Sequence, residues 1–334
     1  MRARFVIVGA GALGSILAAH LARAGHEVTV VARGRRAEQL AQRGVVLRGL
    51  EALAVRVAVA KPSEIASTDT LVLATKAIDT EATLATLRHV ALENAFSLQN
   101  GVLKNRLLAE AFGRERVLGC MADFSGELEA DGVVKFTRNV CLHLGDIGGA
   151  GGTGRANAVS ASIEAAGIRS AAASDIVTLE WSKFVGWIAQ LPLAVLTRRL
   201  TWEFLSDTNA ALVIVRAARE AKSLADAEGI TAFDAPPLPV ASIARSTDEE
   251  AVKLVTAVGQ RYRETAPEHR MSAQQDALRG SPLELEETLG YALERAQALG
   301  VAVPTLTTLY RTVRAAHPVA SGSPRPFQNA KIAG

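Results

Sequence analysis

The chain has 334 residues, of which 49% are hydrophobic and 21% charged, and its formal net charge is +3. This length is sufficient for two domains with cores of their own, and the composition is that of a globular protein. The basic residues are scattered and form no stripe, which argues against a nucleic-acid-binding surface. Every apolar stretch is interrupted well before the ~20 residues of a spanning helix, so we also expect no membrane as a partner.

The two cysteines, Cys120 and Cys141, stand in apolar stretches without the spacing of metal ligands. We therefore expect buried free thiols and no metal site, in keeping with a reducing compartment. The N-terminus leads from Met1 directly into an apolar run, without the basic segment and cleavage site of a secretory signal. These features predict a cytoplasmic protein.

Short apolar runs alternate with helical stretches in the first half of the chain. The predicted strands cover Phe5 to Val8, Val28 to Ala32, Leu71 to Thr75 and Ala95 to Leu98. Between them, "GSILAAHLARAG" and "EATLATLRHVA" repeat apolar residues every three or four positions, which is the helical period. This order predicts a doubly wound parallel sheet with crossover helices, a Rossmann-type α/β fold. Alternation from Val117 to Gly145, around a turn at Ala130-Asp131-Gly132, predicts antiparallel strands added to the sheet edge.

The second half of the chain has a different character. A glycine-rich turn, "GGAGGTGR" at residues 148–155, is of the kind that a domain boundary can use, and one more helix follows it. From about Asp175 to Ala316 nearly every segment has helical spacing. We predict a Rossmann domain at residues 1–170, a helical substrate and dimerisation domain at 171–318, and a loosely ordered tail at 319–334. The apolar helix faces fit a homodimer and packing within one chain equally well.

The run Gly9-Ala10-Gly11-Ala12-Leu13-Gly14 has the spacing GxGxxG between a predicted strand and a predicted helix. In a dinucleotide site the first glycine makes the turn, the second admits the pyrophosphate, and the third lets helix and strand pack closely. The free amides and positive dipole end of the helix favour an anion there. The setting predicts a dinucleotide site, the alternative being a purely structural turn.

The end of the second predicted strand distinguishes between nicotinamide cofactors. An acidic residue there holds the ribose 2′-hydroxyl of NAD, whereas an arginine accommodates the 2′-phosphate of NADP. This sequence places Arg33 at that point, followed by Arg35 and Arg36, and no acid. We therefore predict NADPH as the cofactor and residues 1–170 as an NADP-binding domain. The alternative is that the arginines form an ordinary solvated helix start.

Further polar residues stand at positions where a purely structural role does not require them. Lys76 and Asn100 follow two of the predicted strands, at the sheet edge where doubly wound folds bind ligands. Lys183 lies in the otherwise apolar stretch "TLEWSKFVGWIAQLPL", and Ser272 and Glu284 lie further along the chain. Individually, Lys183 could extend to the surface, Ser272 could cap a turn, and Glu284 could be a first-turn carboxylate after a proline.

With these motifs the sequence resembles the ketopantoate reductases, members of the phosphogluconate-dehydrogenase-like reductase superfamily, over nearly its whole length. The resemblance implies an all-helical C-terminal domain of that superfamily and the reduction of ketopantoate to pantoate, a step of pantothenate biosynthesis, with Lys183 as general acid and Glu284 beside it. It implies cofactor contacts at Gly9, Ala10, Gly11, Ala12, Leu13, Gly14, Arg33, Lys76, Asn100 and Glu284. It implies substrate contacts at Lys76, Asn100, Lys183 and Ser272, to which we add Trp187.

The sequence departs from the family pattern where the substrate is recognised. The family usually has asparagines four and eight residues after the lysine, and this chain has Trp187 and Leu191 there, with Leu289 replacing another asparagine. A site that loses its hydrogen-bonding groups is expected to accept a different substrate, and not only to bind the same substrate with a different affinity. We expect an NADPH-dependent reductase of a small 2-oxo acid or related ketone. A more apolar ketone or imine substrate, or a silent NADP-binding sensor, are the alternatives.

Overall fold

The computed structural model describes residues 2–148 and 153–317. The middle of the glycine-rich turn and the predicted tail at 319–334 lie outside the described residues. The chain divides into two compact units. Unit 1 comprises Met1–Asn100 and Lys104–Val177, and unit 2 comprises Gly101–Leu103 and Thr178–Gly334. The division therefore falls at residue 177, rather than at 170 or in the glycine-rich turn, and a three-residue segment belongs to the other unit.

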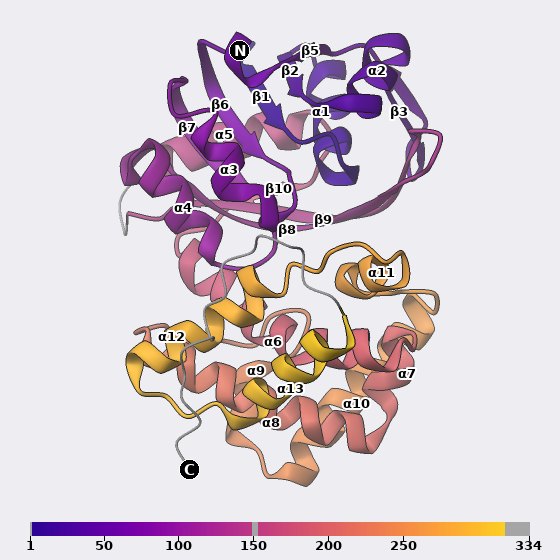
Figure 1. Ribbon diagram of the computed structural model, residues 1–334, viewed down its shortest axis with the longest axis vertical. Coiled ribbons are helices and arrows are strands. Elements are labelled where there is room, and N and C mark those ends of the chain that lie inside the picture. The colour runs from indigo at the N-terminus through magenta and orange to yellow at the C-terminus, as the bar shows by residue number, and fades with distance from the viewer. Residues whose placement is uncertain (1, 149–152, 318–334) are drawn as a thin grey trace. The chain divides into compact units, whose positions relative to one another are not determined.

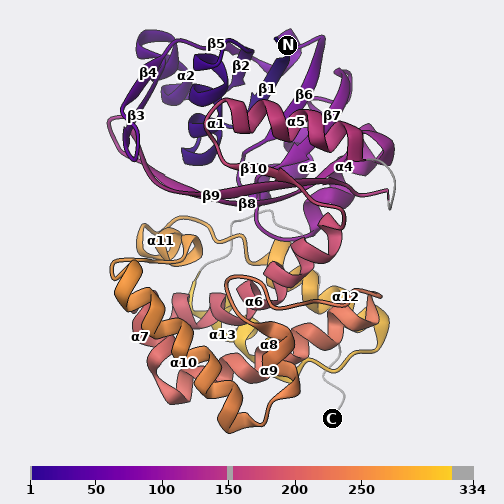
Figure 2. The ribbon, with the colours of Figure 1, turned by 180° about the vertical axis from the view of Figure 1, so that it is seen from behind.

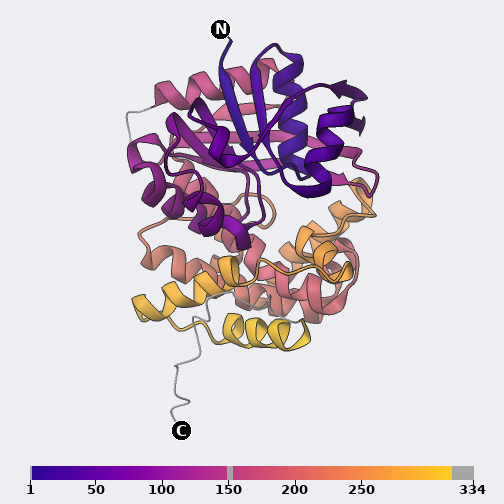
Figure 3. The same cartoon turned by 45° about the horizontal axis from the view of Figure 1, so that its top comes forward.

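A five-stranded parallel sheet forms the centre of unit 1, as the alternation of strands and helices predicts (Figure 1). Its strands, in spatial order, are β5 (Ala58–Ala60), β2 (Glu27–Val31), β1 (Arg4–Val8), β6 (Ser67–Leu73) and β7 (Ala91–Ser97). The helices and 3-10 turns between and after them are α1 (Ala12–Arg23), α2 (Gly34–Arg43), η1 (Pro62–Glu64), η2 (Ala77–Asp79), α3 (Thr80–Ala85), α4 (Leu103–Phe112) and η3 (Arg114–Arg116). The strand order reverses at β1, so the carboxyl ends of β1, β2 and β6 meet at the edge where such sheets bind ligands (Figure 3).

A second sheet in unit 1 corrects the prediction for residues 117 to 145. Its members are β4 (Leu53–Val55), β3 (Val45–Gly49), β9 (Val134–Asp146), β10 (Ser170–Ala172) and β8 (Leu118–Leu128). The long strands β8 and β9 form the predicted antiparallel hairpin, but they do not extend the first sheet. Instead, β9 pairs in parallel with β3 and with β10. These partners come from distant parts of the sequence, which is why local alternation did not reveal the sheet.

Helix α1 lies between the two sheets and is buried on nearly all sides. Its residues from Gly14 to Leu21 are all buried, and Ile16 and Leu17 pack in one core with residues of both sheets, such as Ile7 of β1 and Leu142 of β9. A helix that is apolar all round is expected only where protein covers every face. Helix α5 (Thr153–Ala165) packs beside it (Figure 2). The sequence "ALGSILAAHLAR" therefore specifies a central helix, not a surface one.

Unit 2 is helical, as predicted. Its helices are α6 (Ile176–Thr197), α7 (Thr201–Ser206), α8 (Thr208–Ala227), α9 (Val240–Arg245), α10 (Asp248–Thr265), α11 (Ser272–Leu278), α12 (Tyr291–Leu299) and α13 (Pro304–Ala316), with a π-turn, η4 (Glu286–Gly290), before α12. Among the described helices, none is both long enough and apolar enough to cross a membrane. The homodimer stays a prediction.

Burial of His20 predicts how the stability of unit 1 depends on pH. Its side chain is fully buried, and desolvation lowers the pKa of this imidazole, although Ala166 and Glu51 oppose the shift. Burial lowers the pKa of His26 and His143 as well. The unfolded chain therefore binds more protons than the folded chain below about pH 6.5, so the free energy of unfolding decreases as pH falls from 7.5 to 5.5.

The measurement is urea unfolding of wild-type protein and of His20→Gln, which cannot take up the proton, across that pH range. The variant should lose less stability on acidification than wild type, while keeping the part that is due to His26 and His143. Parallel pH curves for the two proteins would show that His20 is not responsible.

Candidate active site

The three glycines of the loop after β1 have different environments, and the packing of the fold requires two of them. Gly9 has a φ of +108°, and a Cβ built on it would lie 2.7 Å from the backbone of Ala74. A Cβ on Gly14 would lie 2.2 Å from the Gly9 carbonyl oxygen, so only glycine lets α1 pack this closely on the loop. At Gly11, by contrast, no heavy atom of the described residues beyond its own neighbours in the chain lies within 4 Å of such a Cβ. The missing side chain at Gly11 thus leaves open space, although the packing of the fold does not require a glycine there.

The start of α1 has the properties of an anion site. Gly11 is its N-cap, and Ala12 and Leu13 are the first helical residues. Within the described part of the chain, no side chain caps this helix start and its first turn carries no acidic residue. Among the described residues of this helix start, neither a capping side chain nor an acidic one therefore satisfies its first amides or its positive dipole end. Together with the space at Gly11, these residues fit the pyrophosphate of a dinucleotide.

The arginines after β2 have different environments. The side chain of Arg33, the N-cap of α2, is 92% exposed, and its Nη2 atom lies 3.4 Å from a carboxylate oxygen of Asp79. Arg35 donates a hydrogen bond to the Ala130 carbonyl at 3.2 Å. Arg36 is half-buried and turned toward the glycine loop. Arg33 is therefore the arginine with the freedom to meet a 2′-phosphate.

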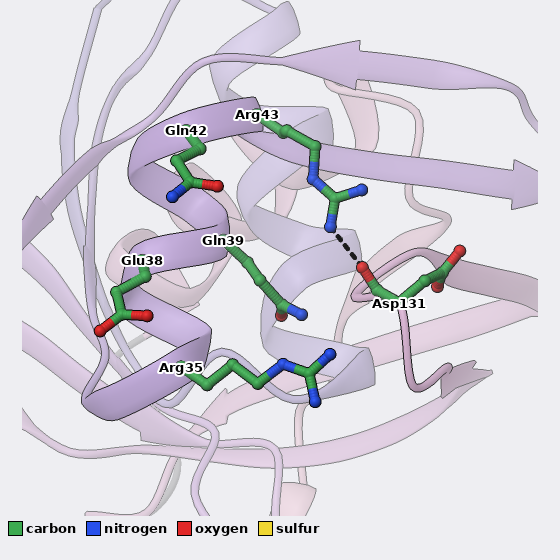
Figure 4. Close-up of a pocket in the computed structure, with 6 residues that line it drawn as sticks. All are labelled: Arg35, Glu38, Gln39, Gln42, Arg43 and Asp131. Atoms are coloured by element: carbon green, nitrogen blue, oxygen red, sulfur yellow. Dashed lines mark hydrogen bonds between the residues drawn. The ribbon is translucent and has the colours of Figure 1, made fainter.

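An open hollow lies on the outer face of α2 (Figure 4). It is lined by Arg35, Glu38, Gln39, Gln42, Arg43 and Asp131. The Arg43 guanidinium donates to the Asp131 carbonyl across it, which ties the end of α2 to the β8–β9 turn. The described residues that line this hollow include none of the predicted site residues.

Lys76 and Asn100 follow β6 and β7, as predicted, and a buried amide joins their two segments. Lys76 is exposed and is the N-cap of η2, while Asn100 is partly exposed. Between the two segments, Gln99 donates from its Nε2 atom to the Thr75 carbonyl at 3.0 Å and to the Thr80 hydroxyl at 2.8 Å. Gln99 was not among the predicted site residues, although a polar residue within the apolar run "FSLQN" was a signal for it.

Lys183 lies on α6, where its immediate neighbours Ser182 and Phe184 are buried while it is itself half-buried. Trp187 and Leu191 follow at intervals of four residues and so lie on the same face of the helix. Both are buried, with 8% and 2% of their surface exposed. The face that carries the lysine is thus apolar, and Trp187 retains only a small accessible area.

Glu284 lies just before η4, and it is half-buried. The Thr288 hydroxyl donates to the Glu284 carbonyl, which fixes the backbone at this position. A Cβ built on Gly101 would lie 3.4 Å from Thr288 Cγ2 and 4.0 Å from Phe184 Cε2. Gly101, which directly follows Asn100 in the chain, therefore lies against both the Lys183 helix and the segment of Glu284.

The π-turn after Glu284 is held by a buried polar network. The Tyr310 hydroxyl donates to both carboxylate oxygens of Glu286, at 2.7 and 2.9 Å, and Arg314 donates to the Tyr310 oxygen at 2.9 Å. Burial and the bond to Glu286 raise the pKa of the Tyr310 hydroxyl, so it stays protonated as a donor. Turns of this π type occur often at functional sites. Sequence reasoning missed this network because its members come from separate helices.

Ser272 is the first residue of α11, and it is exposed. The N-cap of this helix is Met271, so Ser272 does not cap it. The structure therefore leaves its hydroxyl at the surface of unit 2, and its predicted contact with the substrate stays a prediction.

A parallel sheet with a glycine loop, followed by a helical unit with a lysine in an apolar helix, defines a Rossmann-type protein with a helical C-terminal domain. The family model described as ketopantoate reductase PanE/ApbA matches residues 5–149. The model of the C-terminal part of the same family matches residues 175–317. The chain belongs to the ketopantoate reductase family, and it is an oxidoreductase that acts on a CH–OH or C=O group.

Known relatives are similar over almost the whole chain. A 2-dehydropantoate 2-reductase of Archaeoglobus fulgidus is 29% identical over 311 residues, which cover 93% of this chain and 97% of the relative. The crystal structure of 2-dehydropantoate 2-reductase from Methylococcus capsulatus is 26% identical with a TM-score of 0.75, covering 93% and 96%. A ternary structure of D-mandelate dehydrogenase with NADH and anilino(oxo)acetate has the same fold, with a TM-score of 0.79 at 19% identity, covering 93% and 97%.

The glycine geometry predicts opposite effects of alanine at two positions on stability. Gly14→Ala should lower the free energy of unfolding by about 3 kcal/mol, because its methyl group would meet the Gly9 carbonyl. Gly11→Ala should leave it nearly unchanged, because Gly11 has an ordinary φ of −69° and open space around it. Chemical denaturation of both variants measures the difference, and equal losses would contradict this assignment of roles.

Proposed function

We propose that this chain reduces the carbonyl group of a small 2-oxo acid or related ketone, with NADPH as the reductant. The observation that carries the proposal is the uncapped start of α1 beside the open space at Gly11, which fits a dinucleotide pyrophosphate. Bound nicotinamide would supply the hydride. The predicted cofactor contacts are the residues of the glycine loop with Arg33, Lys76, Asn100 and Glu284.

The preference for NADPH over NADH rests on Arg33. Its guanidinium is exposed and forms an ion pair with Asp79 at 3.4 Å. An exposed ion pair of this length contributes little free energy. A phosphate oxygen offers a shorter, charge-assisted hydrogen bond to the same group. We expect the 2′-phosphate to replace Asp79 as the partner of Arg33.

The proton for the reduction would come from Lys183. Negative charge develops on the carbonyl oxygen as the carbon receives hydride, and a positioned donor stabilises it. Lys183 is half-buried on an apolar helix face, and a lysine in such a position is suitable as a positioned proton donor. The family implies that Glu284 lies beside this ammonium group and that Ser272 contacts the substrate carboxylate. It implies that Lys76 and Asn100 lie near the nicotinamide and the substrate.

The choice of substrate depends on the helix face that carries Lys183. Ketopantoate is the substrate that the family implies. A more apolar 2-oxo acid is the second candidate, because Trp187 and Leu191 make this face apolar where the family usually has asparagines. The D-mandelate dehydrogenase with the same fold, which was solved with anilino(oxo)acetate, is consistent with that alternative.

The experiment is a panel of 2-oxo acids that includes ketopantoate, short aliphatic acids and phenyl-substituted acids, tested for NADPH oxidation by the purified chain. A single efficient substrate class identifies the function. If the chain binds the cofactor but none of these acids supports the oxidation of NADPH, the proposal is overturned.

Lys183→Ala should reduce kcat at least about a hundredfold, because it removes the proton donor, and leave the dissociation constant of NADPH unchanged. Lys183→Arg retains the positive charge and should recover part of the rate. The control is Lys253→Ala, since Lys253 is an exposed lysine paired with Glu249 on α10. Full turnover of Lys183→Ala would remove this residue from the mechanism.

Arg33→Ala should weaken NADPH binding about tenfold or more, while NADH binding changes little, because only NADPH carries the 2′-phosphate. Arg35→Ala is the matched control, since Arg35 stands two residues later but donates to the Ala130 carbonyl. Titration of both cofactors by fluorescence gives the two ratios. An equal loss for NADPH and NADH would show that Arg33 does not meet the 2′-phosphate.

A further inference from the structure

Arg36 makes a set of hydrogen bonds that distinguishes it from the neighbouring arginines. Its Nε atom donates to the Ala10 carbonyl at 2.9 Å, and its Nη2 atom donates to the Ser15 hydroxyl at 2.9 Å. Its Nη1 atom donates to the Gly132 carbonyl at 2.8 Å. One guanidinium therefore joins the glycine loop, the first turn of α1 and the turn between β8 and β9.

The turn at Gly132 is shaped for this group. Gly132 has a φ of +88°, and a Cβ built there would lie 2.6 Å from Gln39 Oε1 and 3.0 Å from the Nη1 atom of Arg36. A side chain at this position would therefore collide with the Gln39 amide and crowd the guanidinium of Arg36. Because the turn approaches closely, its carbonyl can accept a hydrogen bond from one of the three donors of the guanidinium. Such a set of contacts is expected for an arginine with a fixed position.

The contact with Ala10 orients the part of the loop that faces the open space. The carbonyl of Ala10 and the N–H of Gly11 belong to one trans peptide and point in opposite directions. The same carbonyl also accepts a hydrogen bond from the Ser15 hydroxyl at 3.1 Å. With its oxygen held by Arg36 and Ser15, this peptide presents the Gly11 N–H on the side away from Arg36.

We propose that Arg36 is a positioning residue, which holds the Ala10–Gly11 peptide in the orientation that binds the pyrophosphate of the cofactor. The inference rests on the proposed function, since it requires a dinucleotide at the glycine loop. Arg36 does not recognise the 2′-phosphate, because its donors are occupied by the loop and by Gly132. The loss of Arg36 therefore weakens the binding of NADPH and NADH by the same factor, whereas the loss of Arg33 weakens the binding of NADPH alone.

The experiment measures the dissociation constants of NADPH and NADH for wild-type protein, Arg36→Met and Arg36→Lys, together with thermal unfolding without cofactor. Arg36→Met should weaken both cofactors by about tenfold and leave the ratio of the two constants unchanged. Arg36→Lys can restore one hydrogen bond but not the fork, so it should recover part of the affinity.

Two further variants separate positioning from general stability. Ser15→Ala removes the hydroxyl that, together with Arg36, donates to the Ala10 carbonyl. It should weaken the binding of both cofactors equally, but by less than Arg36→Met does. Arg43→Met is the matched control, because Arg43 ties the same helix to the same turn through Asp131 without touching the glycine loop (Figure 4). It should leave both dissociation constants unchanged.

The outcomes are distinct. A much larger loss for NADPH than for NADH in Arg36→Met would assign the 2′-phosphate to Arg36 and overturn the inference. Lower thermal stability of that variant with unchanged affinities would make Arg36 a structural residue only, which also overturns it. If wild-type protein binds neither dinucleotide, the proposed function itself fails, and that result is visible before any variant is measured.

Discussion

The burial of α1 between two sheets is the constraint on which the rest of unit 1 depends. The helix packs against β1 and β2 on one side and against β8 and β9 on the other, so its side chains must be small or apolar around the whole circumference. Close packing at its first turn requires Gly14, because the Gly9 carbonyl leaves no room for a Cβ. A helix held this firmly keeps its first amides in a fixed direction, which a phosphate site requires.

The parts of the fold that local pattern determines could be predicted from the sequence. The strands β1, β2, β6 and β7 and the glycine loop follow from hydrophobic runs and turn residues, and the helical character of unit 2 follows from its periodicity. The second sheet could not be predicted in the same way, because β3 pairs with residues of β9 that stand 87 positions later, as Leu47 does with Val134. Such pairing depends on the complementarity of distant segments, which no local window contains.

For the candidate site, the sequence indicated residues for the proposed contacts but not the buried groups that hold them in place. Arg33 was predicted from its position after β2, whereas Arg36, three residues later in a similar sequence context, is directed inward to the glycine loop. Gln99 and Glu286 are buried polar side chains whose partners lie on other elements. Burial of a polar residue depends on its tertiary partners, so sequence reasoning assigns it to the surface by default.

The small segment Gly101–Leu103 belongs to unit 2, although the chain on both sides of it belongs to unit 1. The polypeptide thus passes from one unit to the other three times, and no single cut separates them. A fragment that starts at residue 178 would lack the glycine that packs against Phe184 and Thr288, leaving that part of its apolar interior uncovered. The helical unit is therefore completed by a three-residue segment from much earlier in the sequence, and a fragment that begins at residue 178 does not contain the whole unit.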